Sequence, residues 1–211
     1  MLVSLPEHKV LVLDFDGVIL ESVTIKDMVY RDVFPDTSLN ERDAILTFHL
    51  STPGIYRRTK VQRIFTEVLN RSCNKKDIEG ILSKFRQKVW ERLMVCEEVA
   101  CVREYLERNM NVPKYVVSAS PQEELSALVD ARGFSKYFQN VLGSPKNKLQ
   151  HISNIIEIES VSPNDVLYIG DKISDMVAAR ASGVQFVGRL TEVNPTPFPD
   201  ELQVLNSFCE M

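Results

Sequence analysis

The sequence predicts an α/β fold, a Rossmann-like doubly wound parallel sheet, with an α-helical cap domain inserted into it. Five short runs are almost continuously apolar and rich in β-branched residues, as expected of strands buried on both faces. Helical patterns separate the last four runs, and such alternation indicates a parallel sheet covered by helices. The first run ends at residue 15 and the second begins at residue 114, so far more chain lies between them than one crossover helix needs.

The five apolar runs are the expected strands of the core. Each is short enough for a strand and is bounded by polar residues, glycine or proline. They are KVLVLDF (9–15), KYVVSA (114–119), FQNVLG (138–143), DVLYIGD (165–171) and VQFVG (184–188).

Three helices are expected between the later strands. The first begins with Pro121 and ends at Gly133, and the third ends at Gly183, which are typical start and stop residues. The second places its leucine and isoleucines largely on one face. The three segments are PQEELSALVDARG (121–133), KLQHISNIIEI (148–158) and SDMVAARASG (174–183).

The long segment after the first strand has helical patterns and predicts the inserted domain. The expected helices are at about 22–34, 40–50, 54–70, 75–95 and 97–109. We predict a cap domain over residues 20–93 and a core made of residues 1–19 and 94–211. The last of these helices would then be the first crossover helix of the core.

The composition is that of an ordinary globular protein and restricts its partners. The 211 residues are 44% hydrophobic and 26% charged, which allows a substantial buried core. The net charge of −4 gives no indication of a nucleic-acid-binding surface. Because no apolar run approaches the roughly 20 residues that span a bilayer, no membrane contact is expected.

The cysteines and the N-terminus predict a cytoplasmic protein. Cys73, Cys96, Cys101 and Cys209 form no CxxC pair, and with only scattered histidines they predict neither a zinc site nor a disulfide. Free thiols fit a reducing compartment. The N-terminal stretch MLVSLPEHKV reaches a proline and charged residues too early for the apolar part of a signal peptide.

Two pairs of acids follow two of the predicted strands. Asp14 and Asp16 are two residues apart at the end of the first strand and can face the same point. Asp171 follows the fourth strand, and Asp175 lies where the next helix begins. Ligands of open α/β sheets bind at the carboxyl ends of the strands. Four carboxylates would repel one another there without a cation, and oxygen ligands favour a hard ion such as Mg²⁺.

Complementary groups follow two other predicted strands. The sequence VVSAS offers the Ser118 hydroxyl and backbone N–H groups before a helix, which is a suitable place for an oxyanion. The sequence GSPKNKLQ places Lys146 and Lys148 at the start of the following helix. A lysine there can neutralise the charge of an acid and of a phosphate together.

Together these stretches resemble the four motifs of haloacid dehalogenase superfamily phosphatases. DFDGV resembles the first motif, DxDG[TV]; VVSAS resembles the second, a lysine before a helix the third, and GDKISD the fourth, GDxxxD. They follow the family's order and lie beside predicted strands between about residues 9 and 188. The inserted helices are similar to the cap of the phosphoglycolate phosphatase and β-phosphoglucomutase branch. We therefore expect the core strands in the order 5-4-1-2-3.

The resemblance implies a role for each acid. Asp14 would be the nucleophile and would form an aspartyl-phosphate. Asp16 would protonate the leaving oxygen and then deprotonate the hydrolytic water. Mg²⁺ would be bound by Asp14, by the backbone carbonyl of Asp16 and by Asp171, with Asp175 near or behind it.

The second and third motifs would bind the phosphoryl group. The resemblance assigns this role to Ser118, to the Ala119 N–H and to a lysine. Lys146 and Lys148 both have a spacing to Asp171 that is found in the superfamily. Lys148 is favoured because the apolar helix face begins directly after it.

Three positions depart from the residues that are usual in the family. Val18 replaces the commoner threonine, and Glu21 replaces the aspartate of a usual Asp-Ser pair. Lys172 replaces a small residue, which would make the rim of the metal site more basic. None of these changes removes a group that the chemistry requires.

The predicted cap contains a basic stretch, PGIYRRTK (53–60), which begins with a turn. Similar caps carry G-x-S-R-x-x-K here, which indicates Arg57 and Lys60 as substrate-binding residues, although Tyr56 replaces the serine. The alternative is a solvated basic helix face, and helical geometry does not choose between Arg57 and Arg58.

The sequence thus predicts a Mg²⁺-dependent phosphomonoester hydrolase for a small phosphorylated metabolite such as a sugar phosphate, since a closing cap limits substrate size. The alternative enzyme is a phosphomutase of the β-phosphoglucomutase type, which returns the phosphoryl group to its product. A haloacid dehalogenase or a phosphonatase needs no general acid at the position of Asp16. A catalytically silent binding module would be favoured by the loss of a motif acid, and none is lost.

Overall fold

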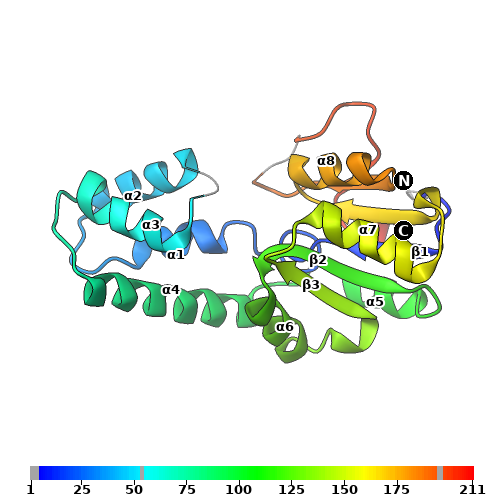
Figure 1. The fold of residues 1–211 in the computed structure, drawn as a ribbon, viewed down its shortest axis with the longest axis horizontal. Helices are drawn as coiled ribbons and strands as arrows, with labels where there is room; N and C mark the ends of the chain where they lie inside the picture. The colour runs from blue at the N-terminus through cyan, green and yellow to red at the C-terminus, as the bar shows by residue number, and fades with distance from the viewer. Residues whose placement is uncertain (1–4, 53–54, 194–196) are drawn as a thin grey trace. The chain divides into compact units, whose positions relative to one another are not determined.

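The computed structural model describes residues 5–52, 55–193 and 197–211. The chain divides into two compact units: Met1–Ser22 with Cys96–Met211, and Val23–Val95. The first unit is an α/β core and the second is helical (Figure 1). The turn expected at residues 53–54 lies outside the described residues.

The core unit is built on a six-stranded parallel sheet with the strand order β3-β2-β1-β4-β5-β6. The predicted α/β class and the order of the first five strands are therefore confirmed. The sixth strand has only two residues, which is too short to give a pattern in the sequence. The strands are β1 (Val10–Leu13), β2 (Lys114–Pro121), β3 (Asn140–Ser144), β4 (Val166–Gly170), β5 (Gln185–Arg189) and β6 (Val204–Leu205).

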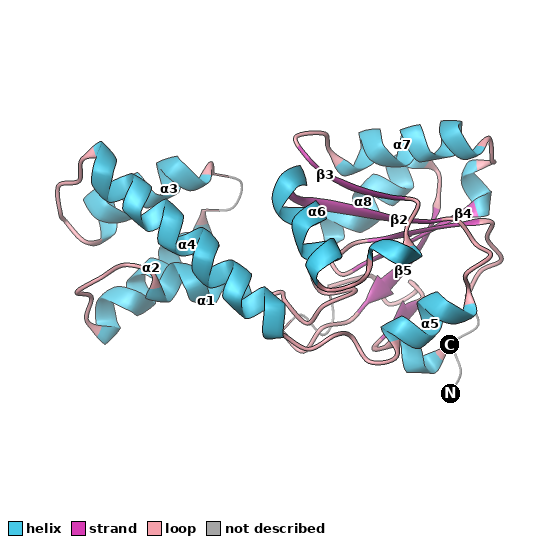
Figure 2. Ribbon diagram, turned by 90° about the horizontal axis from the view of Figure 1, so that it is seen from below, coloured by secondary structure: helices cyan, strands magenta, loops and turns pink. Residues whose placement is uncertain are grey.

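Helices cover both faces of this sheet. The helices α7 (Lys148–Glu159) and α8 (Ile173–Ser182) lie on one face, and α5 (Val102–Arg108) and α6 (Gln122–Ala131) lie on the other (Figures 1 and 2). The chain moves along the sheet in one direction from β1 to β3 and in the opposite direction from β3 to β5. Because the crossovers are right-handed, the two directions place their helices on opposite faces. Short 3₁₀ turns complete the unit at Ser135–Tyr137, Pro163–Asp165 and Phe208–Glu210.

A buried apolar cluster joins α7 and α8 to the sheet. Every residue in it is at most 9% exposed, as expected for strands covered by helices on both faces. Its members are Val10, Val12, Tyr115, Val117, Ile152, Ile155, Val166, Tyr168, Ala178, Ala179 and Val184. The cluster fixes the position of both helices, whose first turns lie at the carboxyl edge of the sheet.

The described residues of the helical unit form four α-helices and one π-helical turn. They are α1 (Ile25–Asp32), α2 (Leu39–Ser51), α3 (Arg57–Arg63), the turn Ile64–Val68 and α4 (Lys75–Val95). A capping box formed by Ser38 and Glu41 begins α2. Within the parts of the chain that the structure describes, none of the helices has the length and apolar character to cross a membrane.

A disulfide joins Cys101 to Cys209 in the core unit, with 5.1 Å between their Cα atoms. The prediction that no disulfide forms is therefore wrong. The two cysteines are 108 positions apart in the sequence, and they meet because the C-terminal 3₁₀ turn packs on the start of α5. Phe208 N donates to Ala100 O at 3.1 Å in the same contact. Among the described residues, Cys73 and Cys96 take part in no disulfide.

Breaking the disulfide should destabilise the core. We expect Cys101→Ser to lower the free energy of unfolding by about 2–4 kcal/mol, because the bond closes a loop of 108 residues in the unfolded chain. Urea unfolding of the variant and the parent protein measures the difference. The control Cys73→Ser should change stability by less than about 0.5 kcal/mol. Four titratable thiols in unreduced, denatured parent protein would contradict the assignment.

Candidate active site

The end of β1 places Asp14 at the centre of the carboxyl edge of the sheet. Leu13 pairs with Val116 of β2 and with Ile169 of β4, so Asp14 has a neighbouring strand end on each side. Asp14 N donates to Ile169 O at 2.9 Å, and Phe15 N donates to Asp14 Oδ1 at 2.7 Å. Asp14 is only 3% exposed, so its carboxylate needs compensating charge close by.

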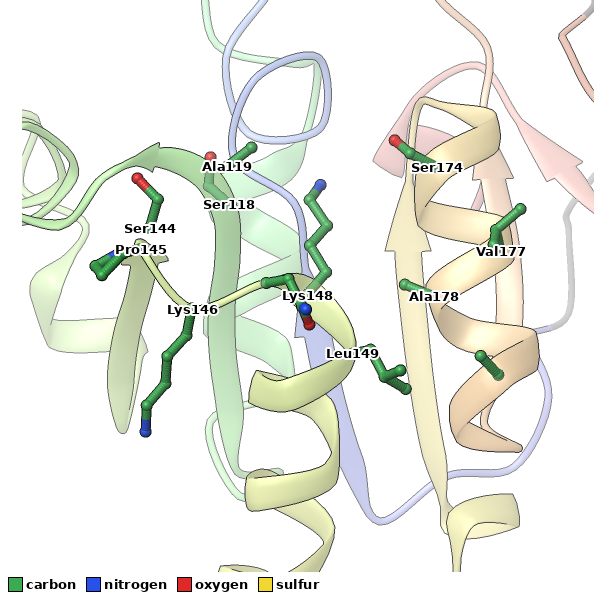
Figure 3. A pocket seen from close by; sticks show the side chains of 12 residues that line it. Ser118, Ala119, Ser144, Pro145, Lys146, Lys148, Leu149, Ser174, Val177 and Ala178 are labelled. Carbon is green, nitrogen blue, oxygen red and sulfur yellow. The ribbon is translucent and has the colours of Figure 1, made fainter. Parts of the chain in front are cut away.

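Lys148 supplies that charge from the first turn of α7. Its Nζ donates to Asp14 Oδ2 at 2.7 Å and also to Asp175 Oδ1. Asn147 caps this helix and forms a capping box with Gln150, which fixes where Lys148 leaves the backbone. Lys146 is exposed, and its side chain extends in the opposite direction from that of Lys148 (Figure 3). Of the two candidate lysines, the structure brings only Lys148 to these acids.

Asp175 is fully buried in the first turn of α8. Besides Lys148, it accepts hydrogen bonds from Tyr168 Oη at 3.3 Å and from Lys172 N at 3.0 Å. Gly170 makes room for it, because a Cβ at that position would lie 2.5 Å from Asp175 Cβ. These contacts use both carboxylate oxygens, so Asp175 anchors Lys148 and the start of α8.

Asp171 differs from its neighbours in leaving one oxygen without a protein donor. The residue is 1% exposed, and Oδ1 is buried with no hydrogen-bond partner among the described residues. One carboxylate oxygen each from Asp14, Asp171 and Asp175 lie within 4.8 Å of one another. A buried carboxylate oxygen without a donor is costly unless a cation binds it. The donor set consists of oxygens and fits a hard divalent ion such as Mg²⁺.

The proximity of these charges changes their pKa values. Burial raises the pKa of Asp14 to about 6; the Lys148 ammonium opposes the rise, while Asp175 and Asp16 add to it. Burial likewise raises the pKa of Asp171 to about 7, against the opposing charge of Lys172. For Lys148, burial lowers the pKa, but Asp14 and Asp175 outweigh burial and raise it above its ordinary value. The site is therefore a group of crowded acids in which Lys148 is held by hydrogen bonds to two of them and Lys172 adds positive charge near a third.

Asp16 is half-buried and accepts hydrogen bonds from two serine hydroxyls. Ser22 Oγ donates to Asp16 Oδ1 at 2.6 Å, and Ser120 Oγ lies 3.4 Å from Asp16 Oδ2. Sequence reasoning missed both serines as partners. Ser120 stands in the VVSAS stretch that was singled out for Ser118, whereas nothing in the sequence pairs Ser22 with Asp16.

The predicted phosphoryl-binding residues lie at the end of β2. Ser118 is buried and its hydroxyl accepts from Ser120 N at 3.2 Å, whereas Ala119 is exposed. A pocket of about 480 Å³ begins at these residues and at Lys148 and continues along α7 and α8 (Figure 3). Its far wall is apolar and consists of Leu149, Val177, Ala178 and Ala181.

The two predicted substrate residues of the cap have partners within the helical unit. Lys60 is 4% exposed, and its Nζ lies 3.0 Å from His49 Nδ1 and donates to His49 O at 3.2 Å. Burial lowers the pKa of Lys60. The Arg57 guanidinium lies over the Phe85 ring, 4.8 Å from its centroid. The neighbouring Arg58 forms an exposed ion pair with Glu79. A substrate-binding role for Arg57 and Lys60 stays a prediction.

Comparison with known proteins shows that a protein-family model matches most of this chain. The model of the haloacid dehalogenase-like hydrolase family matches residues 11–189, which include all four motif segments. A curated protein of Pseudomonas putida described as "Probable phosphoglycolate phosphatase" is 26% identical over 117 residues. The match covers 49% of this chain and 47% of that protein, so the chain spans about half the length of the curated relative that it matches.

Solved structures share the fold across nearly the whole chain. A predicted phosphoglycolate phosphatase from Haemophilus somnus has a TM-score of 0.74 at 18% identity and covers 98% of this chain and 97% of its own. A HAD hydrolase of family IA, variant 3, from Entamoeba histolytica has a TM-score of 0.71 at 14% identity and covers 96% and 95%. At these identities the likeness shows the fold alone.

Removing Lys148 should destabilise the protein because it leaves two buried carboxylates without their cation. We expect Lys148→Met to lower the free energy of unfolding in EDTA by about 3–5 kcal/mol. The matched control is Lys146→Met, which should change it by less than about 0.5 kcal/mol because this lysine is exposed. Urea unfolding of both variants measures the effect. Equal stability of the two variants would contradict the central role of Lys148.

Replacing Asp171 should remove metal binding without harming the metal-free fold. Saturating Mg²⁺ should raise the melting temperature of the parent protein, because a ligand that binds only the folded state stabilises it. We expect Asp171→Asn to lose that shift and to be no less stable in EDTA, since it removes one of several repelling acids. The control Asp165→Asn, which changes a half-buried carboxylate paired with Lys9, should keep the shift. An unchanged shift in Asp171→Asn would place the metal elsewhere.

Proposed function

The chain belongs to the haloacid dehalogenase-like hydrolase family, and from that premise we propose that it hydrolyses phosphomonoesters of small metabolites. The family match confirms the resemblance found in the sequence. The observation that carries the proposal is the environment of Asp14. Its carboxylate is buried and is bonded by Lys148. A carboxylate oxygen of Asp171, whose Oδ1 has no hydrogen-bond partner among the described residues, lies within 4.8 Å of an Asp14 oxygen. This arrangement suits a nucleophile that works next to a cation.

In the first step, a carboxylate oxygen of Asp14 attacks the phosphorus atom of the ester. A bond forms between that oxygen and phosphorus, and the bond from phosphorus to the leaving oxygen breaks. Asp16, in its protonated form, gives its proton to the leaving oxygen, so the product departs as an alcohol. The intermediate is an aspartyl-phosphate on Asp14.

In the second step, Asp16 accepts a proton from a water molecule as the water oxygen attacks phosphorus. The bond between phosphorus and Asp14 breaks, which restores the Asp14 carboxylate and releases inorganic phosphate. Asp16 is then protonated again and ready for the next ester. Its half-buried position, with access to water, supports both proton transfers.

Lys148 and the end of β2 bind the transferring phosphoryl group in this proposal. Lys148 holds Asp14 in place and offsets negative charge as the phosphoryl group is transferred. Ser118 and the Ala119 N–H supply hydrogen bonds to the phosphoryl oxygens. All three residues line the same pocket, which supports a shared ligand.

Mg²⁺ is the cofactor of the proposed reaction. Asp14, Asp171 and the backbone carbonyl of Asp16 would hold it, with Asp175 behind them as the anchor for Lys148. Bound Mg²⁺ would offset the negative charges of the carboxylates and of the phosphate ester.

The substrate is proposed to be a small phosphorylated metabolite. The description of the curated relative makes phosphoglycolate the first compound to test, followed by sugar phosphates. We also propose a cytoplasmic location. The disulfide between Cys101 and Cys209 counts against the thiol argument for it, because disulfides are rare in a reducing compartment.

Phosphate release with Mg²⁺ across a panel of phosphorylated metabolites tests the function, and Asp14→Asn tests the nucleophile. We expect the parent protein to release inorganic phosphate, and excess EDTA to stop the release. Asp14→Asn should release none, because an amide is not a nucleophile towards phosphorus. Its circular dichroism and melting temperature should show a retained fold.

The matched control is Asp165→Asn, a half-buried carboxylate paired with Lys9 outside the site, which should be as active as the parent protein. Phosphate release by pure Asp14→Asn protein, once deamidation has been excluded by mass spectrometry, would overturn the nucleophile assignment. A parent protein that is inactive on the whole panel would contradict the proposed reaction.

A further inference from the structure

Arg189, the last residue of β5, is a buried cation that belongs to none of the four motifs. Its side chain is 6% exposed. Nη1 donates to Gly17 O at 3.0 Å and to Glu21 Oε2 at 2.8 Å, and Nη2 donates to Glu21 Oε1. Nε donates to Asn206 O at 3.2 Å, which ties the same guanidinium to the end of β6. The guanidinium thus joins the loop after β1 to the end of the edge strand β6.

The loop that Arg189 binds is the one that carries Asp16. Gly17 has a φ of +76°, a conformation that favours glycine, so the chain reverses directly after Asp16. The N–H groups of Ile19 and Leu20 both donate to Phe15 O, at 3.0 and 3.3 Å, which closes the turn. The Gly17 carbonyl points out of this turn and is bonded by Arg189.

The two residues that Arg189 contacts are the sequence neighbours of the two residues whose hydrogen bond orients Asp16. Arg189 binds residues 17 and 21, and the residues just outside them, Asp16 and Ser22, are joined by the 2.6 Å bond from Ser22 Oγ. A displacement of residue 17 or 21 would therefore move one end of that bond. Both ends are held by one rigid, planar group, which a lysine could not replace because it lacks the fork of donors.

Glu21 explains why an arginine can be buried here. A buried guanidinium is costly unless its donors are satisfied, and a bidentate carboxylate satisfies two of them. Glu21 was noted in the sequence as a departure from the usual aspartate. Its longer side chain reaches the guanidinium with both oxygens.

We propose that Arg189, together with Glu21, positions Asp16 for its proton transfers. The inference rests on the proposed function, in which Asp16 is the general acid and base. Arg189 touches neither the reacting atoms nor the metal-binding acids in the contacts described above, so it is a positioning residue. Its effect is geometric, because a general acid must lie within hydrogen-bond reach of the oxygen that it protonates.

A comparison of two leaving groups tests the proposal. p-Nitrophenolate leaves readily without a proton, whereas the alkoxide of a simple alkyl phosphate does not, so only the alkyl ester depends on a well-placed acid. We expect Arg189→Lys and Glu21→Gln to lower kcat/KM for the alkyl phosphate by about tenfold or more, a part of the roughly 100-fold or greater effect of a general acid. For p-nitrophenyl phosphate, kcat/KM should change less than about threefold.

The matched control is Arg63→Lys, which alters a second bidentate Arg–Glu pair, with Glu67, on the exposed surface of the helical unit. It should leave kcat/KM for both esters unchanged. An equal loss of kcat/KM for both esters in Arg189→Lys and Glu21→Gln would mean that the pair only stabilises the fold, and this would overturn the proposal. Unchanged kcat/KM for both esters would overturn it as well.

Hydrogen exchange separates this inference from the proposed reaction. In Mg²⁺-free protein, Arg189→Lys should speed amide exchange in the peptide that covers residues 15–22, while peptides from β4 and α8 keep the parent rates. If the parent protein hydrolyses neither ester, the proposed function fails and exchange alone then decides whether Arg189 holds the loop. Unchanged exchange in residues 15–22 would overturn the positioning role in either case.

Discussion

The contact of Lys148 with Asp14 and Asp175 is the interaction on which the rest of the core depends. Two carboxylates buried at the same sheet edge repel each other, and neither has enough water to be stable as an anion alone. One ammonium between them lowers this cost for both. The sheet order, the start of α7 and the close approach of Gly170 to Asp175 all help to bring these three charges together.

The remaining imbalance of charge determines what the site can do. Asp171 adds a third buried carboxylate, and Lys148 cannot neutralise all three. In the proposed function, a divalent cation bound to these acids would offset their negative charge and would let the site accept an anionic ester. Around this centre, hydroxyls of Ser22 and Ser120 orient Asp16, and Arg189 holds the loop from outside. Stability and chemistry therefore use the same charges.

Much of the fold and of the site could be predicted from the sequence. The strands are short, continuous apolar runs, and their alternation with helices defines the sheet without reference to distant contacts. Asp14, Asp16, Asp171 and Asp175 follow strand ends, and parallel strands bring such ends to one edge. The positions of these acids relative to the predicted strands are therefore enough to predict that they lie close together. The two-residue strand β6 escaped prediction because it has no local pattern of its own.

Alone, the sequence determined the fold class and the identity of the motif acids, since both depend on local pattern and spacing, whereas the order of the core strands was expected from the family resemblance. Only the tertiary structure decided between Lys146 and Lys148, because helix capping and the direction of each side chain separate them. It alone paired Cys101 with Cys209 and brought Arg189 to the Asp16 loop. These contacts join residues more than 100 positions apart, and such proximity arises from the packing of the whole sheet.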